Sequence, residues 1–487
     1  MKWGTTAALA AIAAGLFAYI MLVERHSLSD GELEERKGHV LKDFIRDKVS
    51  RIEIQGDGEA IVLERKDPDG DGEMGDLLPR WELTLPVRDE ADSDAVDTLL
   101  GAVQWADARR TLKDVTAEDL ARFGLVNPGR TVTFHVADRT ASLRFGDKEP
   151  RGAGYYAQVD ENTVVVVGQD VFEAADPDPS AYREKAVFRA FPVVDATSIT
   201  WREAGVEARL EKRDQQWWVD APSGLRGSNP GIENLLSDLG DLRAVRFVEG
   251  TSENVGGASL ANPIRTIEIG GADGGVRVRI GETCDGEPSR TAVAPPDGGV
   301  GGGAPTVGTD VPLRMVRVDT GPVLCVEQAS LDKVLVPVTH LVQERLLAME
   351  EHDVVRLTVT GTEGKIDYRR TPEGRWMDHR TESGGDPEGA DGVDPVAGTV
   401  IALDLQALHQ ARFDEVGELP PGEGVGTIRI EGEAMPPEEL VLYRVDADGA
   451  WIRRGAETKL TRYPVEIAPL FKGNLERFRT HLAPPPP

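Results

Sequence analysis

Three stretches of the chain repeat one pattern, in which alternating apolar and polar residues are followed by a helical spacing of apolar residues. In the first stretch, Val96, Leu99, Leu100 and Val103 have the i, i+3, i+4, i+7 spacing of one helix face. The corresponding positions in the other two stretches are Ile232, Leu235, Leu236 and Leu239, and then Val396, Thr399, Val400 and Leu403. The spacing predicts an amphipathic helix in each stretch, with one position polar in the third.

A short oxygen-bearing residue stands before each predicted helix. The candidate N-caps are Asp92, Ser93 and Asp94 for the first helix, Ser228 and Asn229 for the second, and Asp394 for the third, and proline follows at Pro230 and Pro395. Such side chains accept a backbone N–H that the first helical turn leaves unpaired, and proline at the helix start loses no hydrogen bond. These residues therefore indicate where the three helices begin.

Alternating residues before and after each helix predict antiparallel strands with one buried face. The strand before each helix carries Trp81, Trp218 or Trp376, which we expect to be core or sheet-packing residues, not ligand platforms. The sequence thus predicts an α+β protein made of three tandem repeats of a domain, each built from antiparallel sheet with a packed helix. Agreement in element order and helix spacing favours tandem duplication, with a period far beyond the 20–50 residues of solenoid repeats.

We expect the chain to divide into six parts. These are a transmembrane signal anchor at residues 1–26, a helical stalk at 27–48, repeat domains at 49–191, 192–349 and 350–482, and a proline tail at 483–487. The second domain contains a Gly/Pro-rich loop at 294–310, and the third contains an acidic loop at 383–394. Sequences of this composition cannot bury a core.

The N-terminal segment has the length and composition of a membrane span. Residues 3–23 are 21 residues without a charge, which as a helix would cover roughly 30 Å, the thickness of a bilayer's hydrocarbon core. Lys2 precedes the segment, which favours an N-terminus on the cytoplasmic side. A cleavable signal peptide is the alternative, but the bulky run from Met21 offers no small-residue cleavage site. We therefore expect a single-pass anchor in the bacterial inner membrane, with the bulk of the chain in the periplasm.

Net charge and motif content disfavour some classes of function. The chain holds 55 Lys and Arg against 84 Asp and Glu, a net charge of −29, which disfavours nucleic acid as a partner. The 8 histidines are scattered without metal-ligand spacing, and neither an H-E-x-x-H nor a G-x-S-x-G motif occurs. We accordingly expect a non-enzymatic protein.

Two further features are candidate sites. Asp67, Asp69 and Asp71 alternate ahead of Gly72, as oxygen ligands do in a calcium loop. Leu78 stands where such a loop needs a bidentate glutamate, so other carboxylates of the segment would have to complete the site. The residues that would do so are Glu73 and Asp76. The alternative is a solvated acidic loop, and no other cofactor is expected.

The chain has two cysteines, Cys284 and Cys325, which fall on neighbouring predicted strands of the second domain. In an oxidising compartment they could form a disulfide. The alternative is that both are small buried apolar residues.

Several short motifs resemble those of the domain of unknown function 4340 family. They comprise Trp81, Leu83 and Pro86; Ala91 and Asp92; Phe123, Gly124, Leu125 and Pro128; Phe145 and Gly146; and Tyr155, Tyr156 and Ala157. The resemblance is good in the first repeat, fair in the second and loose in the third. It implies an association with ABC transporters of the gliding-motility type and an accessory or scaffold role in the cell envelope, with no catalytic residues to carry over.

The sequence therefore predicts a membrane-anchored periplasmic accessory or scaffold protein of such a transporter complex, with protein partners in the inner membrane. The alternative is a module that binds an envelope polymer or a small ligand and is stabilised by calcium. A repeated exposed aromatic cleft would favour the second hypothesis.

Overall fold

The structure is a computed structural model. It describes residues 36–42, 44–66, 80–150, 152, 154–189, 191–203, 205–248, 260–272, 274–284, 311–378, 395–433 and 436–474. Within these ranges, no helix has the length and apolar character needed to cross a bilayer. The predicted anchor at residues 3–23 lies outside the described residues.

The chain divides into two compact units, with the division between Lys185 and Ala186. The first unit contains one nine-stranded sheet, and the second contains a nine-stranded and an eight-stranded sheet. We call these the first, second and third sheets. All three are antiparallel and carry a few helices, so the chain is an α+β protein.

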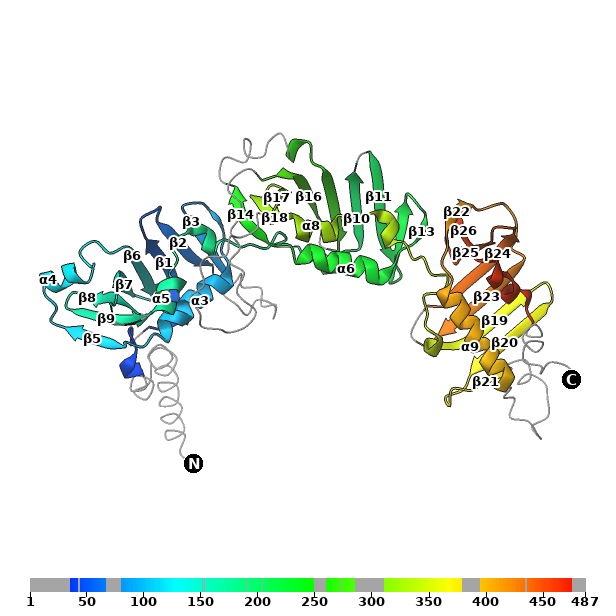
Figure 1. Ribbon diagram of the computed structural model, residues 1–487, viewed down its shortest axis with the longest axis horizontal. Coiled ribbons are helices and arrows are strands. Elements are labelled where there is room, and N and C mark those ends of the chain that lie inside the picture. Colours follow the sequence, from blue (N-terminus) through cyan, green and yellow to red (C-terminus); the bar gives the residue numbers. More distant parts are fainter. Residues whose placement is uncertain are drawn as a thin grey trace, which may run out of the picture. The chain divides into compact units, whose positions relative to one another are not determined.

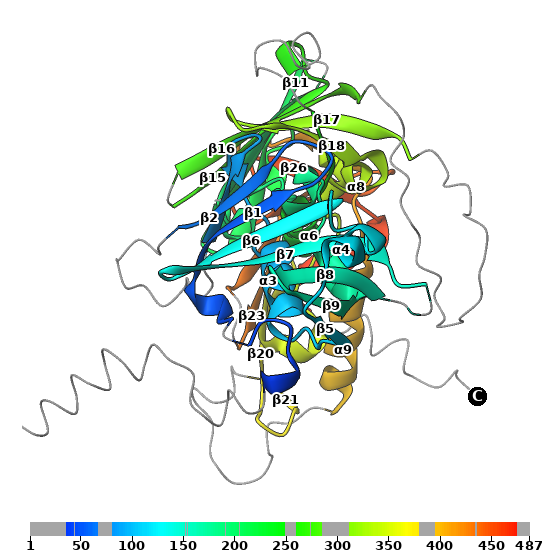
Figure 2. The same ribbon diagram turned by 90° about the vertical axis from the view of Figure 1, so that its left-hand side faces the viewer.

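The first unit contains the first sheet with its helices (Figure 1). Its elements are β1 (Val49–Gln55), β2 (Ile61–Lys66), β3 (Arg80–Leu85), β4 (Asp89–Glu90), α3 (Ser93–Gln104), β5 (Arg110–Lys113), α4 (Ala117–Arg122), β6 (Arg130–Val136), β7 (Arg139–Lys148), β8 (Gly154–Asp160), β9 (Thr163–Gly168), α5 (Gln169–Ala174) and η4 (Pro179–Tyr182). The strand order is β4-β3-β2-β1-β6-β7-β8-β9-β5. Figure 2 shows β2, β1, β6, β7, β8 and β9 of this sheet side by side.

The second sheet follows the same order of elements. They are η5 (Val193–Asp195), β10 (Ser198–Glu203), β11 (Val206–Arg213), β12 (Gln216–Ala221), β13 (Leu225–Arg226), α6 (Asn229–Gly240), β14 (Ala244–Val248), β15 (Arg265–Gly271), β16 (Gly274–Thr283), β17 (Leu313–Val318), β18 (Val323–Glu327), α8 (Gln328–Val334) and η6 (Val338–Leu341). The strand order β13-β12-β11-β10-β15-β16-β17-β18-β14 corresponds position by position to that of the first sheet.

The third sheet has the same arrangement in its described part, apart from the short edge strand. Its elements are η7 (Glu351–Asp353), β19 (Val354–Gly361), β20 (Gly364–Arg370), β21 (Trp376–Asp378), α9 (Pro395–Gln410), β22 (Glu415–Glu418), β23 (Gly426–Gly432), β24 (Glu438–Val445), β25 (Ala450–Arg454), β26 (Lys459–Tyr463) and η8 (Val465–Lys472). The order is β21-β20-β19-β23-β24-β25-β26-β22.

The first two predicted helices are confirmed with their buried faces. Val96, Leu99, Leu100 and Val103 are the buried residues of α3, and the predicted positions of α6 are buried in the same way. The Asp92 carboxylate accepts the Ala95 N–H at 3.0 Å and so caps α3. Ser228 is the N-cap of α6, with its hydroxyl 3.3 Å from the Gly231 nitrogen.

The predicted face of the third helix is only partly right, because Val400 is 1% exposed as predicted but two other positions are not buried. Thr399 is exposed and Leu403 is 50% exposed. The buried set with the i, i+3, i+4, i+7 spacing is Ile401, Asp404, Leu405 and Leu408. The helix α9 has 16 residues, against 12 in α3 and in α6, and the buried face begins at Ile401 instead of Val396. The position that has become polar is therefore Asp404.

The tryptophan assigned to the second sheet is also wrong by one residue. Trp81 and Trp376 are 3% and 5% exposed, but their counterpart is Trp217, which is fully buried. Trp218 is half-buried, because successive side chains of a strand point to opposite faces. Sequence alone could not choose between two adjacent tryptophans.

The described part of the predicted stalk belongs to the first unit. It contains two short 3-10 turns, Arg36–Gly38 and Arg46–Lys48, in place of a continuous helix. Val40 and Phe44 are 8% and 2% exposed and pack in the core of this unit. Burial of these apolar side chains draws the segment onto the sheet.

Candidate functional site

Each sheet has one face packed in a hydrophobic core and one face lined with charged pairs. Figure 1 shows α6 lying along the second sheet and α9 along the third. On the opposite face of the first sheet, Arg51 contacts Glu53 at 2.8 Å and Glu64 at 2.7 Å, and His135 lies 3.2 Å from Glu53. Desolvation acts to raise the pKa of Glu53, but hydrogen bonds from Arg51 and His135 outweigh it and hold the pKa below its ordinary value.

The second and third sheets carry similar pairs on this face. In the second sheet, Glu207 contacts Arg202 at 3.0 Å and Arg209 at 2.8 Å. In the third, both nitrogens of the Arg356 fork bind Asp367, at 3.0 and 2.9 Å. The pairs of the first two sheets are partly exposed, and exposed ion pairs contribute only about 0–1 kcal/mol each to stability. These pairs therefore define the chemistry of two polar surfaces more than they hold the fold together. In the third sheet, Asp367 is 8% exposed, so its pair with Arg356 is partly buried.

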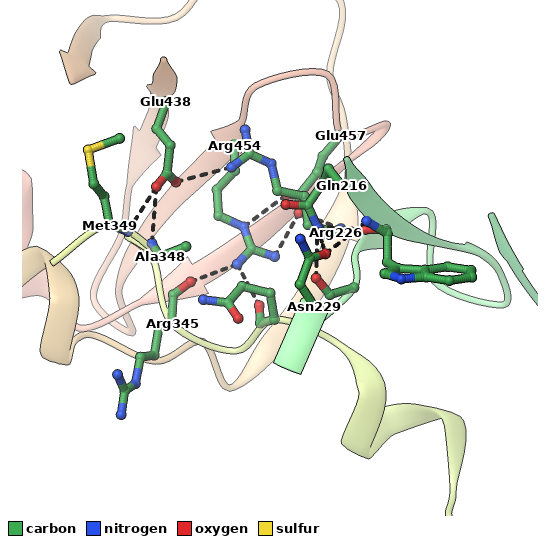
Figure 3. Close-up of polar contacts among 12 residues, drawn as sticks. Gln216, Arg226, Asn229, Arg345, Ala348, Met349, Glu438, Arg454 and Glu457 are labelled. Carbon is green, nitrogen blue, oxygen red and sulfur yellow. Dashed lines mark hydrogen bonds and ion pairs between the residues drawn. The ribbon is translucent and has the colours of Figure 1, made fainter. Parts of the chain in front are cut away.

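The most elaborate polar site lies between the second and third sheets, where residues 341–349 connect them (Figure 3). Backbone bonds tie one end to the second sheet: Ser228 N–H donates to Leu341 O at 2.7 Å, and Gln343 N–H donates to Arg226 O at 2.9 Å. At the other end, the Leu346 N–H donates to Ala411 O, just after α9, at 2.9 Å. The connecting segment is thus bonded to both sheets.

Two glutamates of the third sheet bind Arg226 of the second. The Glu438 carboxylate lies 3.0 Å from the Arg226 guanidinium and accepts the N–H groups of Ala348 and Met349 at 3.2 and 3.0 Å. Glu457 accepts the Arg226 backbone N–H at 2.9 Å. Figure 3 shows both carboxylates pointing toward Arg226 and the connecting segment.

Arg454 completes this site from β25. Its guanidinium lies 2.7 Å from the Glu457 carboxylate, and the two side chains are 1% and 0% exposed. It also donates to the carbonyls of Gln343 and, at 2.8 Å, Arg345. Burial acts to lower the pKa of Arg454, but Tyr463, Glu457 and Glu438 raise it above its ordinary value, so the group stays charged. We call Arg226, Glu438, Arg454 and Glu457 the junction network.

The first unit has a simpler counterpart on the same backbone pattern. Asp92 N–H donates to Tyr182 O at 2.9 Å, and Glu184 N–H donates to Glu90 O at 3.0 Å. Its side-chain contacts include a buried pair, in which the Arg183 guanidinium lies 2.7 Å from Asp89, with 5% and 7% exposure, and a more exposed pair of Lys185 with Asp92 at 3.5 Å. In the first unit the carboxylate, Asp89, lies on strand β4. In the second unit it is the arginine, Arg226, that lies on the corresponding strand β13.

A cavity of about 520 Å³ lies beside the junction network. Trp218 and Arg226 line it from the second sheet, and Pro437 and Glu438 line it from the third. A half-buried indole beside fixed polar groups is a combination suited to binding a small polar ligand. This cavity is the candidate binding site of the second unit.

The predicted site residues have different outcomes. The candidate calcium loop, with Asp67, Asp69, Asp71, Glu73 and Asp76, lies outside the described residues. Elsewhere, within the described ranges, no group of three or more His, Cys, Asp or Glu side chains is arranged to hold a metal ion.

The two cysteines form a disulfide. The sulfur atoms of Cys284 and Cys325 are 2.14 Å apart and the Cα atoms 6.1 Å apart. Cys284 directly follows β16 and Cys325 lies in β18, so the bond links two strands that flank β17.

Sequence reasoning missed the junction network. Arg226 is 212 positions from Glu438 and 231 from Glu457. No local pattern links charged residues that far apart, so none of the four residues could be singled out from the sequence.

Comparison with known proteins identifies one family. Residues 81–263 match the family described as Domain of unknown function (DUF4340), and no curated protein matches the chain. The matched range begins at Trp81, which opens the sequence motifs noted above, and includes the division between the two units. Over residues 81–263 the chain is therefore similar to the Domain of unknown function (DUF4340) family.

Proposed function

We propose that this protein is a non-enzymatic accessory or scaffold protein of the bacterial cell envelope, built from three tandem copies of one α+β domain. The observation that carries the proposal is the recurrence, in all three sheets, of one face packed in a core and one face of charged pairs. A repeated polar surface on a repeated framework provides several similar contact sites along one chain. This is what a scaffold that gathers protein partners requires.

The cellular setting is part of the same proposal. Residues 3–23 anchor the chain in the inner membrane as a single span, with the N-terminus in the cytoplasm and the domains in the periplasm. The resemblance of residues 81–263 to the family supports a partner among ABC transporters of the gliding-motility type. The disulfide between Cys284 and Cys325 is compatible with an oxidising compartment.

Purification of the tagged full-length chain from its native membrane in mild detergent, followed by mass spectrometry, tests this proposal. We expect the transporter permease and ATPase subunits to be recovered with it. A Leu16→Arg variant places a charge in the proposed anchor and should lose both the membrane fraction and these partners. Recovery of the wild-type protein without transporter subunits would contradict the accessory role.

A second candidate function is a module that binds an envelope polymer or a small ligand, stabilised by calcium at Asp67, Asp69 and Asp71. The cavity that contains Trp218 favours this reading. Calcium should then raise the melting temperature of the wild-type chain and leave an Asp69→Asn/Asp71→Asn variant unchanged. An equal response of both proteins would exclude calcium stabilisation through this loop.

A further inference from the structure

A groove in the first unit combines an apolar floor with a basic rim. Its volume is about 740 Å³, within the range of about 300–1,000 Å³ that is typical of ligand sites. Val40, Phe44 and Val165 form the floor and belong to the hydrophobic core. Lys42 and Lys113 line the groove as exposed side chains. The groove therefore offers apolar side chains at its floor and positive charge at its rim.

The charge at this groove is opposite in sign to that of the whole chain. Lys42, Lys113 and Arg139 line it in a protein with a net charge of −29. Among its described lining residues Asp160 is the one carboxylate, and that group accepts the Asn162 N–H at 2.9 Å. Within the described parts of the chain, neither Lys42 nor Lys113 forms an ion pair. Two exposed ammonium groups are therefore available to an anion.

The groove also lies close along the chain to the proposed membrane anchor. Residues 24–37 separate the end of that segment from Gly38, where the groove wall begins, and a fully extended chain of this length reaches at most about 50 Å. Residues 38–42 form one wall of the groove. If the anchor is correct, this wall stays within that distance of the membrane surface.

We propose that the groove binds an anionic phospholipid, with the phosphate at Lys42 and Lys113 and part of an acyl chain over Val40, Phe44 and Val165. This inference rests on the proposed membrane anchor. Zwitterionic lipids lack the net negative charge that the lysines attract, so the site discriminates by headgroup charge. Lipid binding here would hold the first unit against the bilayer.

The test uses the full-length chain in phosphatidylcholine vesicles that contain a photoactivatable phosphatidylglycerol. We expect cross-links on peptides that cover residues 38–44 and 108–113. A lysine near an anionic surface strengthens binding about fivefold, so Lys42→Gln/Lys113→Gln should reduce cross-linking roughly 25-fold. The matched control is Lys333→Gln, which removes an exposed charge in the second unit and should leave the yield unchanged.

Several outcomes would overturn the proposal: cross-links outside the groove, an equal yield from the double variant, or an equal yield with photoactivatable phosphatidylcholine. Flotation of the protein with the vesicles is measured first and reports on the anchor separately. A chain that does not float contradicts the anchor. The groove is then tested on the chain in solution with dihexanoyl phosphatidylglycerol. Binding that the double variant loses supports the groove, and binding that it keeps, or no binding, overturns it.

Discussion

The two connecting segments of this protein share a backbone pattern and differ in their side chains. In the first unit, Asp92 and Glu184 donate N–H groups across the segment at 2.9 and 3.0 Å. In the second unit, Ser228 and Gln343 make the equivalent bonds at 2.7 and 2.9 Å. The first segment has the buried pair of Arg183 with Asp89 and the more exposed pair of Lys185 with Asp92, and the second has the junction network.

The difference shows which features the two connections share and which they do not. Backbone hydrogen bonds need no particular side chain, so the same bonds can occur in both connections although the sequences differ. Buried charges need a partner in a definite place, so they are particular to one connection. The junction network should therefore couple the second and third sheets, whereas the pair in the first unit should act within that unit alone.

The largest expected effect comes from removing one charge of the junction network. Glu457→Gln leaves the buried Arg454 without its carboxylate, and loss of one partner of a buried pair costs about 3–5 kcal/mol. Urea unfolding should show this loss in the transition of the second unit only. Glu118→Gln is the matched control, because Glu118 pairs with Arg122 on the surface with 86% exposure, and it should change nothing measurable. A Glu457→Gln protein of wild-type stability would contradict the importance of the network.

A loss of similar size is expected at the counterpart in the first unit. Arg183→Met leaves the buried Asp89 carboxylate without its guanidinium, and loss of one partner of a buried pair costs about 3–5 kcal/mol. The first unit's unfolding transition should move while the second unit's stays in place. Arg122→Met removes a surface arginine of the same unit and serves as the control. A shift of both transitions by Arg183→Met would show that the two connections are not independent.

The helix caps next to the two segments should behave alike. Asp92→Ala and Ser228→Ala each remove a side-chain acceptor at a helix start, which costs about 1 kcal/mol. Asn234→Ala, at an exposed position within α6, is the control and should not destabilise the helix. Denaturant midpoints measure all three. Unequal costs for the two caps would mean that the helices are not equivalent.

The weakest expected effect under ordinary conditions is at Tyr463, which lies beside Arg454. Burial raises the pKa of Tyr463 from 10.0 to about 12, although Arg454 acts to lower it. Folding favours the neutral phenol, so this stability is fully present below pH 10 and is lost as the pH rises through 12. The second unit of Tyr463→Phe should therefore lose less stability than that of the wild type as the pH rises from 10 to 12. An unchanged alkaline pH profile would exclude Tyr463 as its source.

Local periodicity predicted part of this fold well. The faces of α3 and α6 follow from one apolar spacing each, and the structure buries those residues. In α9, apolar residues are dense enough to satisfy two spacings, and only the sheet selects the one that begins at Ile401. The choice of Trp217 over Trp218 depends likewise on strand register, which the pattern of adjacent aromatic residues does not give.

The candidate sites were harder to predict, for a different reason. The cysteine pair could be proposed because the chain has two cysteines on neighbouring strands. Arg226 and Glu457 meet only because two sheets come together, and each resembles an ordinary surface charge in sequence. The groove at Lys42 and Lys113 likewise requires β5 to pack beside the N-terminal segment.

Differential scanning calorimetry of the full-length chain tests the central claim most directly, namely that the junction network joins the second and third sheets into one cooperative unit. We predict two transitions in the wild-type protein, one for each unit. We also predict that Arg226→Ala divides the second transition into two, because this change removes the guanidinium bound to Glu438. Three separate transitions in the wild type, or an undivided second transition in Arg226→Ala, would contradict that claim.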